Sequence, residues 1–273
     1  MHEDFPSSPL AAEAQFLEAE SALGAKRNYA AGELYAKYAE QRPLSSRVRD
    51  VEKHMYKIGL WLIEDGRRGL WGLGIFTTSE EGVSLLRRLA TLLPTGEYAD
   101  DALMRIGRWY AEDRDFVGAE TTLEDLLKNY PSSEWVLEAR FLLGWTYRED
   151  NRGPAYDGEK LRRARAEFLA FAAKASADPA RAAEYADRIR AAREEVAAID
   201  DDLARKALLR ARFYERSGRP EAALAVLREG ARSWGSTEHG RECGDRADAL
   251  ARDLGVEAPS GPSAPPPAED GKQ

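Results

Sequence analysis

The sequence contains one cysteine, Cys243, and three histidines, His2, His54 and His239, which lie far apart along the chain. A single cysteine excludes an internal disulfide and leaves the redox compartment open. No serine lies in a nucleophile elbow, and no glycine-rich loop leads from a strand into a helix. With so few candidate catalytic residues, we expect a protein that is not an enzyme and needs no cofactor.

The chain also lacks an apolar run of about 18 residues, so no segment is expected to span a membrane. Residues 1–10 have no basic stretch followed by an apolar one, as a secretory signal would have. The sequence therefore predicts either a cytoplasmic protein or a chain that begins downstream of its signal. The formal net charge is −8, which argues against binding to nucleic acid or to an anionic membrane surface.

Residues 99–131 have the pattern of two amphipathic helices folded back on one another. Apolar and small residues recur at steps of three and four in each half, which places them on one face of a helix: Leu103, Ile106, Gly107 and Tyr110, then Phe116, Ala119, Leu123, Leu126 and Tyr130. A polar turn, residues 112–115, separates the halves. Pro131 ends the second helix because proline lacks an amide proton and clashes with the preceding turn.

Small residues at fixed offsets define this motif. Gly107 and Ala119 are twelve residues apart, and Pro131 follows after twelve more. Small side chains at the first two positions allow the helix backbones to approach closely, and the proline closes the pair. This spacing is typical of a tetratricopeptide repeat.

Similar pairs occur before and after this segment. They are residues 10–41, 48–63 with 80–93, 134–148 with 161–178, and an unbroken helix at 180–216 followed by 220–234. A last helix at 237–254 would cap the array. We therefore predict an all-α, tetratricopeptide-repeat-like α-solenoid of about five helix pairs over residues 10–254. Residues 1–9 are expected to form a flexible lead-in and residues 255–273 a disordered proline-rich tail.

An insert at residues 65–79 interrupts the second pair. It is rich in glycine and carries four large apolar residues: Trp71, Leu73, Ile75 and Phe76. A loop this apolar is expected to pack against something. One interpretation is that it covers the edge of its own repeat, and the other is that it is a docking loop for a partner.

The binding prediction concerns the first helix of each pair, whose side chains line the groove of such an array. Counting from the small residue of each helix gives seven candidates: Tyr56, Lys57, Met104, Arg108, Phe141, Trp145 and Arg148. Aromatic and arginine side chains dominate binding hot spots. An alternative is that Phe141 and Trp145 pack between repeats.

Two sequence patterns resemble parts of metal sites, but we interpret both as structural. His239 and Cys243 are four residues apart on one helix, but a zinc site needs further ligands and none lies nearby in the sequence. The run Asp200-Asp201-Asp202 lacks the spacing of a calcium loop. We expect no metal site at either position and a solvated helix turn at residues 200–202.

Beyond the generic repeat, the order of features resembles that of the outer membrane protein assembly factor BamD family. The late part of the chain has that family's series of an alanine, an aromatic pair, a basic residue, a glycine and an alanine, namely Ala211, Phe213, Tyr214, Arg216, Gly218 and Ala223. The 37-residue step from Gly107 to Gly144, the turn at Tyr130–Ser133, and Ala164 with Phe168 also fit. The resemblance covers residues 10–254.

The resemblance implies a periplasmic scaffold at the outer membrane, without catalysis. Members of that family bind a segment of an unfolded outer-membrane protein through the N-terminal repeats and the other subunits of the β-barrel assembly machinery through the C-terminal ones. The lipid-bearing cysteine that follows the signal peptide in the family is absent here, as is any match to the insert containing Trp71. The alternative is a cytoplasmic tetratricopeptide-repeat adaptor or co-chaperone that binds partner peptides.

Overall fold

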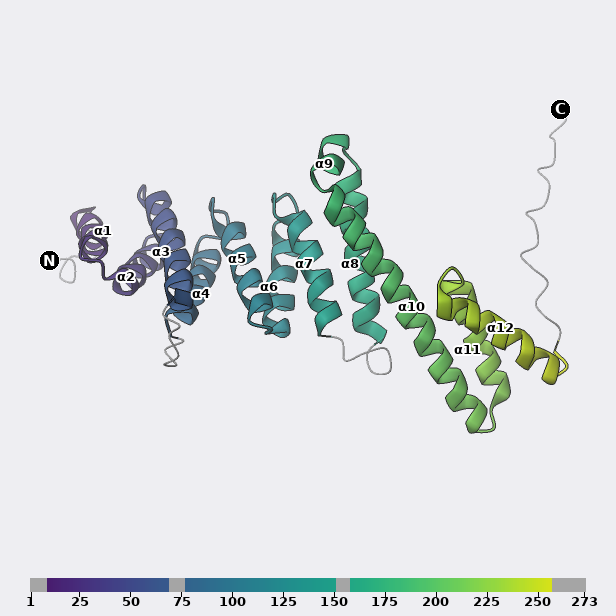
Figure 1. Ribbon diagram of the computed structural model, residues 1–273. Coiled ribbons are helices and arrows are strands. Elements are labelled where there is room, and N and C mark those ends of the chain that lie inside the picture. The colour runs from purple at the N-terminus through teal and green to yellow at the C-terminus, as the bar shows by residue number, and fades with distance from the viewer. Residues whose placement is uncertain (1–8, 69–76, 151–157, 257–273) are drawn as a thin grey trace, which may run out of the picture. The chain divides into compact units, whose positions relative to one another are not determined.

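The structure is a computed structural model that describes residues 9–68, 77–150 and 158–256. These residues form twelve helices and no strand (Figure 1), so the predicted all-α, tetratricopeptide-repeat-like architecture is confirmed. Contacts between residues divide the chain into two units. Unit 1 comprises Met1–Asp150 and Ala166–Ile189, and unit 2 comprises Asn151–Arg165 and Arg190–Gln273. A single continuous array over residues 10–254 stays a prediction.

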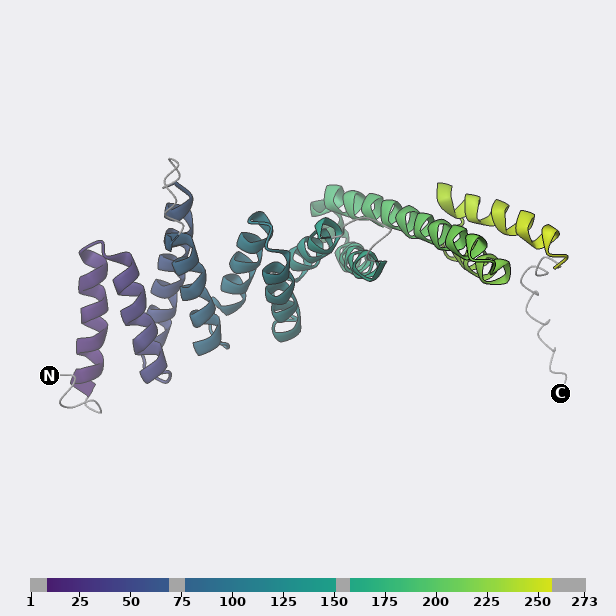
Figure 2. The same cartoon turned by 90° about the horizontal axis from the view of Figure 1, so that it is seen from below.

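Unit 1 is built from successive antiparallel helix pairs. Its helices are α1 Pro9–Gly24, α2 Asn28–Gln41, α3 Val48–Arg68, α4 Thr77–Leu92, α5 Ala99–Glu112, α6 Phe116–Asn129, α7 Val136–Glu149, most of α8 Gly158–Ser176, α9 Pro179–Glu184 and the first turn of α10 Ala186–Arg216. From α1 to α7 each helix packs against the next, and α5 also contacts α7. Figure 2 shows the same pairs from below.

Close approach of the helices within a pair depends on glycine. A Cβ atom added to Gly107 on α5 would lie 2.7 Å from the Leu123 side chain on α6. One added to Gly82 on α4 would lie 2.7 Å from the backbone oxygen of Gly59 on α3. Ala119 is fully buried at the equivalent place on α6. The small residues of the sequence motif thus mark points of close contact between the paired helices.

The turn inside a pair also repeats. Lys26, Arg114 and Gly218 each stand two residues before the second helix of their pair and have positive φ angles of 61°, 63° and 69°. This left-handed conformation reverses the chain direction, and glycine is the residue that adopts it most readily. In the central pair the Asp115 carboxylate then accepts a hydrogen bond from the Gly118 amide at 2.9 Å and caps α6.

Unit 2 has a core of small residues. It contains α10 from Arg190, α11 Pro220–Trp234 and α12 Glu238–Asp253, together with the start of α8. Buried alanines and leucines of these three helices surround Cys243: Ala207, Leu208, Ala211, Ala223, Leu224, Leu227, Ala247 and Ala251. Gly230 on α11 leaves room for the Cys243 sulfur, which would lie 2.8 Å from an added Cβ.

Two expectations about helix boundaries need correction. The predicted unbroken helix over residues 180–216 is interrupted at Tyr185, where the backbone has φ −99° and ψ 14°. The Tyr185 ring packs edge-on to Phe171 at 6.1 Å between ring centroids, and this contact accompanies the break between α9 and α10. Helices α3 and α4 also extend into the predicted insert, to Arg68 and from Thr77. The remaining insert, the first eight residues of the lead-in and residues 257–273 of the tail lie outside the described residues.

Candidate functional site

A line of aromatic and charged side chains runs along the first helices of consecutive pairs in unit 1. We call it the first-helix face and define it by six residues: Tyr56, Tyr98, Asp101, Arg108, Trp135 and Glu138. It begins where the Tyr56 ring on α3 stacks on Tyr98, which directly precedes α5, with 4.9 Å between centroids and 27° between planes. Burial is the main cause that raises the pKa of the Tyr56 hydroxyl, so this side chain stays neutral and can donate a hydrogen bond.

The face continues from α5 to the residue before α7. The indole nitrogen of Trp135 donates a hydrogen bond to the Asp101 carboxylate. Burial raises the pKa of that carboxyl, as do neighbouring acids such as Asp100, while the hydrogen bond from Trp135 opposes them. The two residues therefore hold the α6–α7 turn against α5.

Arg108 and Glu138 complete the face, and Arg188 of α10 adjoins it. The Arg108 guanidinium on α5 lies over the Trp135 ring, 4.9 Å from its centroid, and forms an ion pair with Glu138 on α7 at 2.8 Å. The other oxygen of Glu138 is 3.8 Å from Arg188 in the first turn of α10. Arg188 in turn lies 6.0 Å from the centroid of Phe141. Stacking of a guanidinium on an aromatic ring favours a fixed orientation of the charge.

The structure brings together only some of the seven residues predicted from the sequence. Tyr56 and Arg108 lie on the first-helix face, and Lys57 is exposed beside Tyr56 on α3. Met104 is a correction: it is 1% exposed and belongs to the core, so it cannot line a groove. A first helix packs against its own partner and against neighbouring pairs, so its buried arc is wider than the single stripe that the sequence count assumes.

The predicted residues on α7 occupy different surroundings. Phe141 packs edge-on to Phe168 and Phe171 of α8, with 5.6 and 5.2 Å between centroids, so these contacts lie within its own helix pair. Trp145 packs edge-on to Phe116 at 6.3 Å, near the start of α6. Arg148 is half-buried near the end of α7.

The four apolar residues of the proposed docking loop lie outside the described residues: Trp71, Leu73, Ile75 and Phe76. The docking-loop interpretation therefore stays a prediction. Sequence reasoning missed Tyr98, Asp101, Trp135, Glu138 and Arg188. The 34-residue step from Asp101 to Trp135 was the one available signal, since it equals the common tetratricopeptide period.

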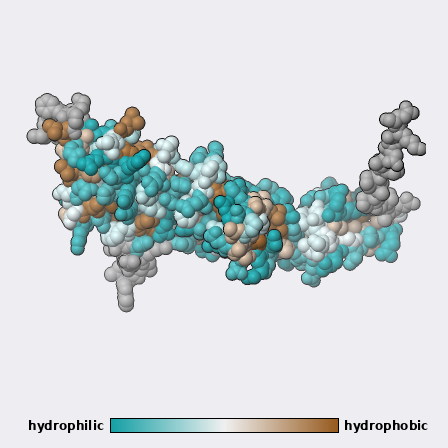
Figure 3. All heavy atoms as spheres, turned by 90° about the horizontal axis from the view of Figure 1, so that it is seen from above, coloured by the Kyte–Doolittle hydropathy of each residue, from teal (hydrophilic) through white to brown (hydrophobic). Residues whose placement is uncertain are grey.

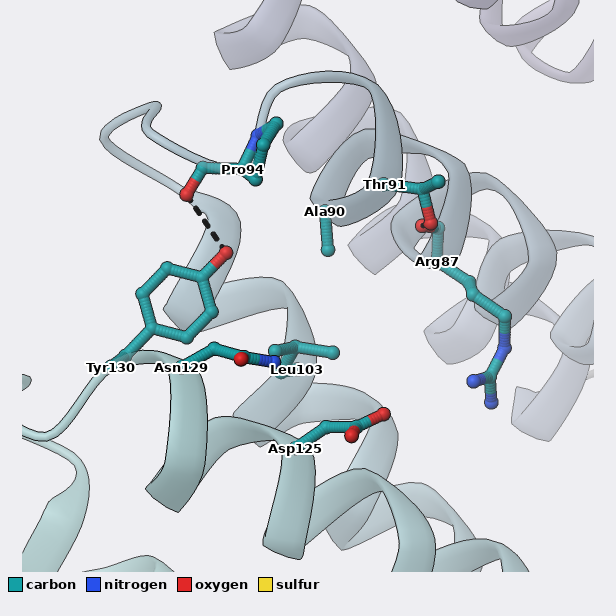
Figure 4. A pocket seen from close by; sticks show the side chains of 8 residues that line it. All are labelled: Arg87, Ala90, Thr91, Pro94, Leu103, Asp125, Asn129 and Tyr130. Carbon is teal, nitrogen blue, oxygen red and sulfur yellow. Dashed lines mark hydrogen bonds between the residues drawn. The ribbon is translucent and has the colours of Figure 1, made fainter.

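A second feature of unit 1 is a hollow of about 450 Å³ between α4 and α6 (Figure 4). Tyr130 closes one end by donating a hydrogen bond from its hydroxyl to the Pro94 carbonyl at 2.9 Å. The hollow is lined by Arg87, Ala90, Thr91, Pro94, Leu103, Asp125, Asn129 and Tyr130. Arg87 is already engaged, since it donates to the Tyr110 hydroxyl at 3.1 Å. None of the seven residues predicted for binding lines this hollow.

Unit 2 carries an exposed apolar and basic surface on α10, which we call the α10 patch. Leu209 and Phe213 are 39% and 59% exposed, one helical turn apart. Leu209 and Phe213 line a shallow hollow of about 250 Å³ with Lys206 and Arg210. Leu209 also lines a second hollow of about 410 Å³ with Arg212, Glu215 and Arg216. In Figure 3 hydrophilic residues cover much of the molecular face, with hydrophobic patches between them. The net charge of the chain is negative, so the basic residues around Leu209 and Phe213 differ in sign from the chain as a whole.

His239 and Cys243 do not face a common ion. The His239 Nδ1 atom lies 2.7 Å from an Asp201 carboxylate oxygen, and the His239 amide donates to the other oxygen at 2.9 Å. The Cys243 thiol is buried and directed at the Ala204 carbonyl. Burial raises the pKa of this thiol to about 11, so the reactive thiolate is scarce at neutral pH. Within the described ranges no three His, Cys, Asp or Glu side chains are grouped as metal ligands.

The acidic run at residues 200–202 is a correction to the solvated turn predicted from the sequence. Asp200 forms an ion pair with Arg165 at 2.6 Å, and Asp201 binds the start of α12 through His239. Two of the three carboxylates therefore hold helices together. This arrangement needs partners 35 and 38 residues away, which the local sequence does not reveal.

The contact of Asp201 predicts acid sensitivity of unit 2. Partial burial raises the pKa of the Asp201 carboxyl, but hydrogen bonds from His239 and Thr237 outweigh burial and bring it below its usual value. Because the folded-state pKa is lowered, the stabilisation is complete above the unfolded value of about 3.9 and is lost as the pH falls through the folded value. We expect Asp201→Ala to lower the free energy of unfolding at pH 7 by about 1–3 kcal/mol.

Urea denaturation of wild type and Asp201→Ala at pH 7 and at lower pH measures this difference. The exposed Asp245 lies on α12, the helix that Asp201 contacts, and supplies the matched control Asp245→Ala. A difference between wild type and Asp201→Ala that does not shrink below about pH 4 would contradict the assigned role of the carboxylate.

Comparison with known proteins places the chain in a family. Stacked helix pairs with glycine and alanine at their contacts define a tetratricopeptide-repeat-like protein, a class whose surfaces bind other proteins. Residues 77–259 match the model of the outer membrane lipoprotein family YfiO. That match spans more than half of the chain, and the protein belongs to this family. No curated protein matched the sequence. No helix in the described part of the chain is long and apolar enough to cross a membrane.

Proposed function

We propose that this protein is a non-catalytic scaffold of the outer-membrane β-barrel assembly machinery that helps to recognise and insert outer-membrane proteins. Its membership of a family of outer membrane lipoproteins supports a role at the periplasmic face of the outer membrane. The repeat architecture supports a role in binding proteins. The resemblance to the BamD family connects these two properties with the assembly machinery.

The observation that carries the proposal is the first-helix face. Its aromatic rings, from Tyr56 to Trp135, come from consecutive helix pairs, so an extended segment lying across the pairs can contact each in turn. Tyrosine and tryptophan provide a large contact area at a low cost in side-chain entropy. Arg108 provides a cation for backbone carbonyls or for a terminal carboxylate. The segment that fits is an extended piece of an unfolded outer-membrane protein, such as its last strand.

Other subunits of the machinery are proposed to dock on unit 2 through the α10 patch. Phe213 and Leu209 offer an apolar contact, and the arginines beside them favour a partner surface that carries acidic residues. This assignment separates the two activities, since unfolded clients bind unit 1 and folded partners bind unit 2. It agrees with the division between N-terminal and C-terminal repeats that the resemblance implies.

A peptide titration tests the client site. The probe is a peptide with the sequence of the last strand of an outer-membrane barrel protein, with a fluorophore at its N-terminus. We expect wild type to bind at about micromolar Kd, because an unfolded client loses entropy on binding. Arg108→Ala should weaken binding by about tenfold or more, since hydrogen bonds to charged groups contribute about 1.5–3 kcal/mol.

Arg88→Ala is the matched control. Arg88 forms an ion pair with Glu33 at 2.9 Å and its side chain is 34% exposed, against 2.8 Å and 32% for Arg108, but it joins the second helices α4 and α2. Equal binding by wild type and Arg108→Ala would show that the first-helix face is not the client site. Retained capture of the machinery's subunits by Arg108→Ala would support separate surfaces.

A further inference from the structure

The strongest charge arrangement on the first-helix face converges on one side chain. One carboxylate oxygen of Glu138 lies 2.8 Å from a guanidinium nitrogen of Arg108. The other oxygen lies 3.8 Å from a guanidinium nitrogen of Arg188. The three residues come from α5, α7 and α10, and all lie within unit 1. Two cations from two different helices therefore share a single carboxylate.

Each of the two arginines stacks on an aromatic ring. Arg108 lies 4.9 Å from the Trp135 centroid and Arg188 lies 6.0 Å from the Phe141 centroid. Trp135 is itself fixed by its hydrogen bond to Asp101. Guanidinium groups that rest on fixed rings keep their position when their anion is exchanged, because the ring contact does not depend on that anion. The arrangement is therefore a preformed anion site.

Glu138 is not locked into that site. Its side chain is 27% exposed, and those of Arg108 and Arg188 are 32% and 47% exposed. Ion pairs with such exposure contribute only about 0–1 kcal/mol, because solvent screens them and the side chains lose entropy. A glutamate on this flexible tether can swing into solvent when another carboxylate takes its place.

We propose that Glu138 is an internal stand-in for a carboxylate of the bound polypeptide, and that the client displaces it from Arg108 and Arg188. This inference rests on the proposed function of the first-helix face, and it names the group that is recognised and the group that regulates access. The ligand class is an extended segment with a free terminal carboxylate. A segment without the carboxylate leaves Glu138 in place and gains only the aromatic contacts.

The test compares two forms of one peptide on wild type and Glu138→Gln. The peptide ends in phenylalanine, either with its free carboxylate or as the terminal amide. Glutamine keeps the size of the side chain and removes the competing charge. We expect Glu138→Gln to bind the carboxylate form about two- to fivefold more tightly than wild type does, the range that a weak ion pair allows, and to bind the amide form with unchanged affinity.

Further variants make the result specific. Glu33→Gln removes an acid that pairs with Arg88 outside the face and should behave as wild type. Arg108→Gln and Arg188→Gln should each reduce the preference for the carboxylate form. Glu138→Asp keeps the charge on a shorter side chain and should lie between wild type and Glu138→Gln. Thermal melting of each variant establishes that it is folded.

The outcomes separate this inference from the proposed function. If both peptide forms bind but Glu138→Gln tightens neither, or tightens both equally, the displacement of Glu138 is refuted while the client site stands. If neither form binds wild type or Glu138→Gln, the client site and the displacement are both refuted.

Discussion

Replacing Phe168 with alanine is expected to lower the free energy of unfolding of unit 1 by about 3–5 kcal/mol. Phe168 is 1% exposed on α8. Its ring packs edge-on to Phe141 of α7 and lies directly over Gly144, where an added Cβ would be 3.0 Å from the ring. Truncation therefore removes a whole ring from the α7–α8 contact, and the helix backbones cannot collapse fully into the space.

The neighbouring residue supplies the control. Leu169 follows Phe168 on the same helix but is 41% exposed, so Leu169→Ala should cost less than about 1 kcal/mol. Urea denaturation monitored by circular dichroism measures both variants. Similar losses for Phe168→Ala and Leu169→Ala would contradict the packing of α8 on α7.

A single methyl group at Gly82 is expected to destabilise the α3–α4 pair. An added Cβ would lie 2.7 Å from the Gly59 oxygen and 2.9 Å from the Ile63 nitrogen. Both are backbone atoms, so α3 and α4 would have to separate. Overpacking costs about 1–3 kcal/mol, and the better helix propensity of alanine offsets about 1 kcal/mol of it. We expect a net loss of up to about 2 kcal/mol for Gly82→Ala.

Gly244→Ala is the matched control for the glycine substitution. Gly244 is also inside a helix, α12, but an added Cβ there meets only the Ala231 methyl at 3.7 Å, an ordinary contact. This change should stabilise unit 2 by about 0.5–1 kcal/mol through helix propensity. Thermal melting distinguishes the two, and a stabilising Gly82→Ala would show that the α3–α4 approach is looser than described.

Periodicity predicted the helices of the central pair almost to the residue, because a helix that must bury one face repeats its apolar residues at a helical step. Gly107 and Ala119 predicted the contact between α5 and α6, since close backbone approach permits only small side chains. The break at Tyr185 could not be predicted, because it coincides with a contact to Phe171 on another helix. No local breaker residue marks it.

The first-helix face was predicted less completely than the fold. Counting along one helix identified Arg108 and Tyr56, which lie well inside the bounds of α5 and α3. It missed Tyr98 and Trp135, which precede their helices and belong to no periodic stripe. Glu138 and Arg188 acquire their significance only from each other and from Arg108, across three helices. Such convergence depends on how pairs stack, which a single sequence does not encode locally.

The joints between pairs also explain how the chain can change in length. Glu52 on α3 is buried and accepts a hydrogen bond from the Tyr98 amide at the entrance of α5, at 2.7 Å, and Asp101 on α5 holds Trp135 at the entrance of α7. Glu52 and Tyr98 are 46 residues apart in the sequence, whereas Asp101 and Trp135 are 34 residues apart. Each carboxylate accepts a hydrogen bond directly from the next pair, whatever the number of residues between donor and acceptor. Evolution can therefore add or remove residues between the two helices of a pair, as at residues 65–79, without shifting the register in which the next pair stacks.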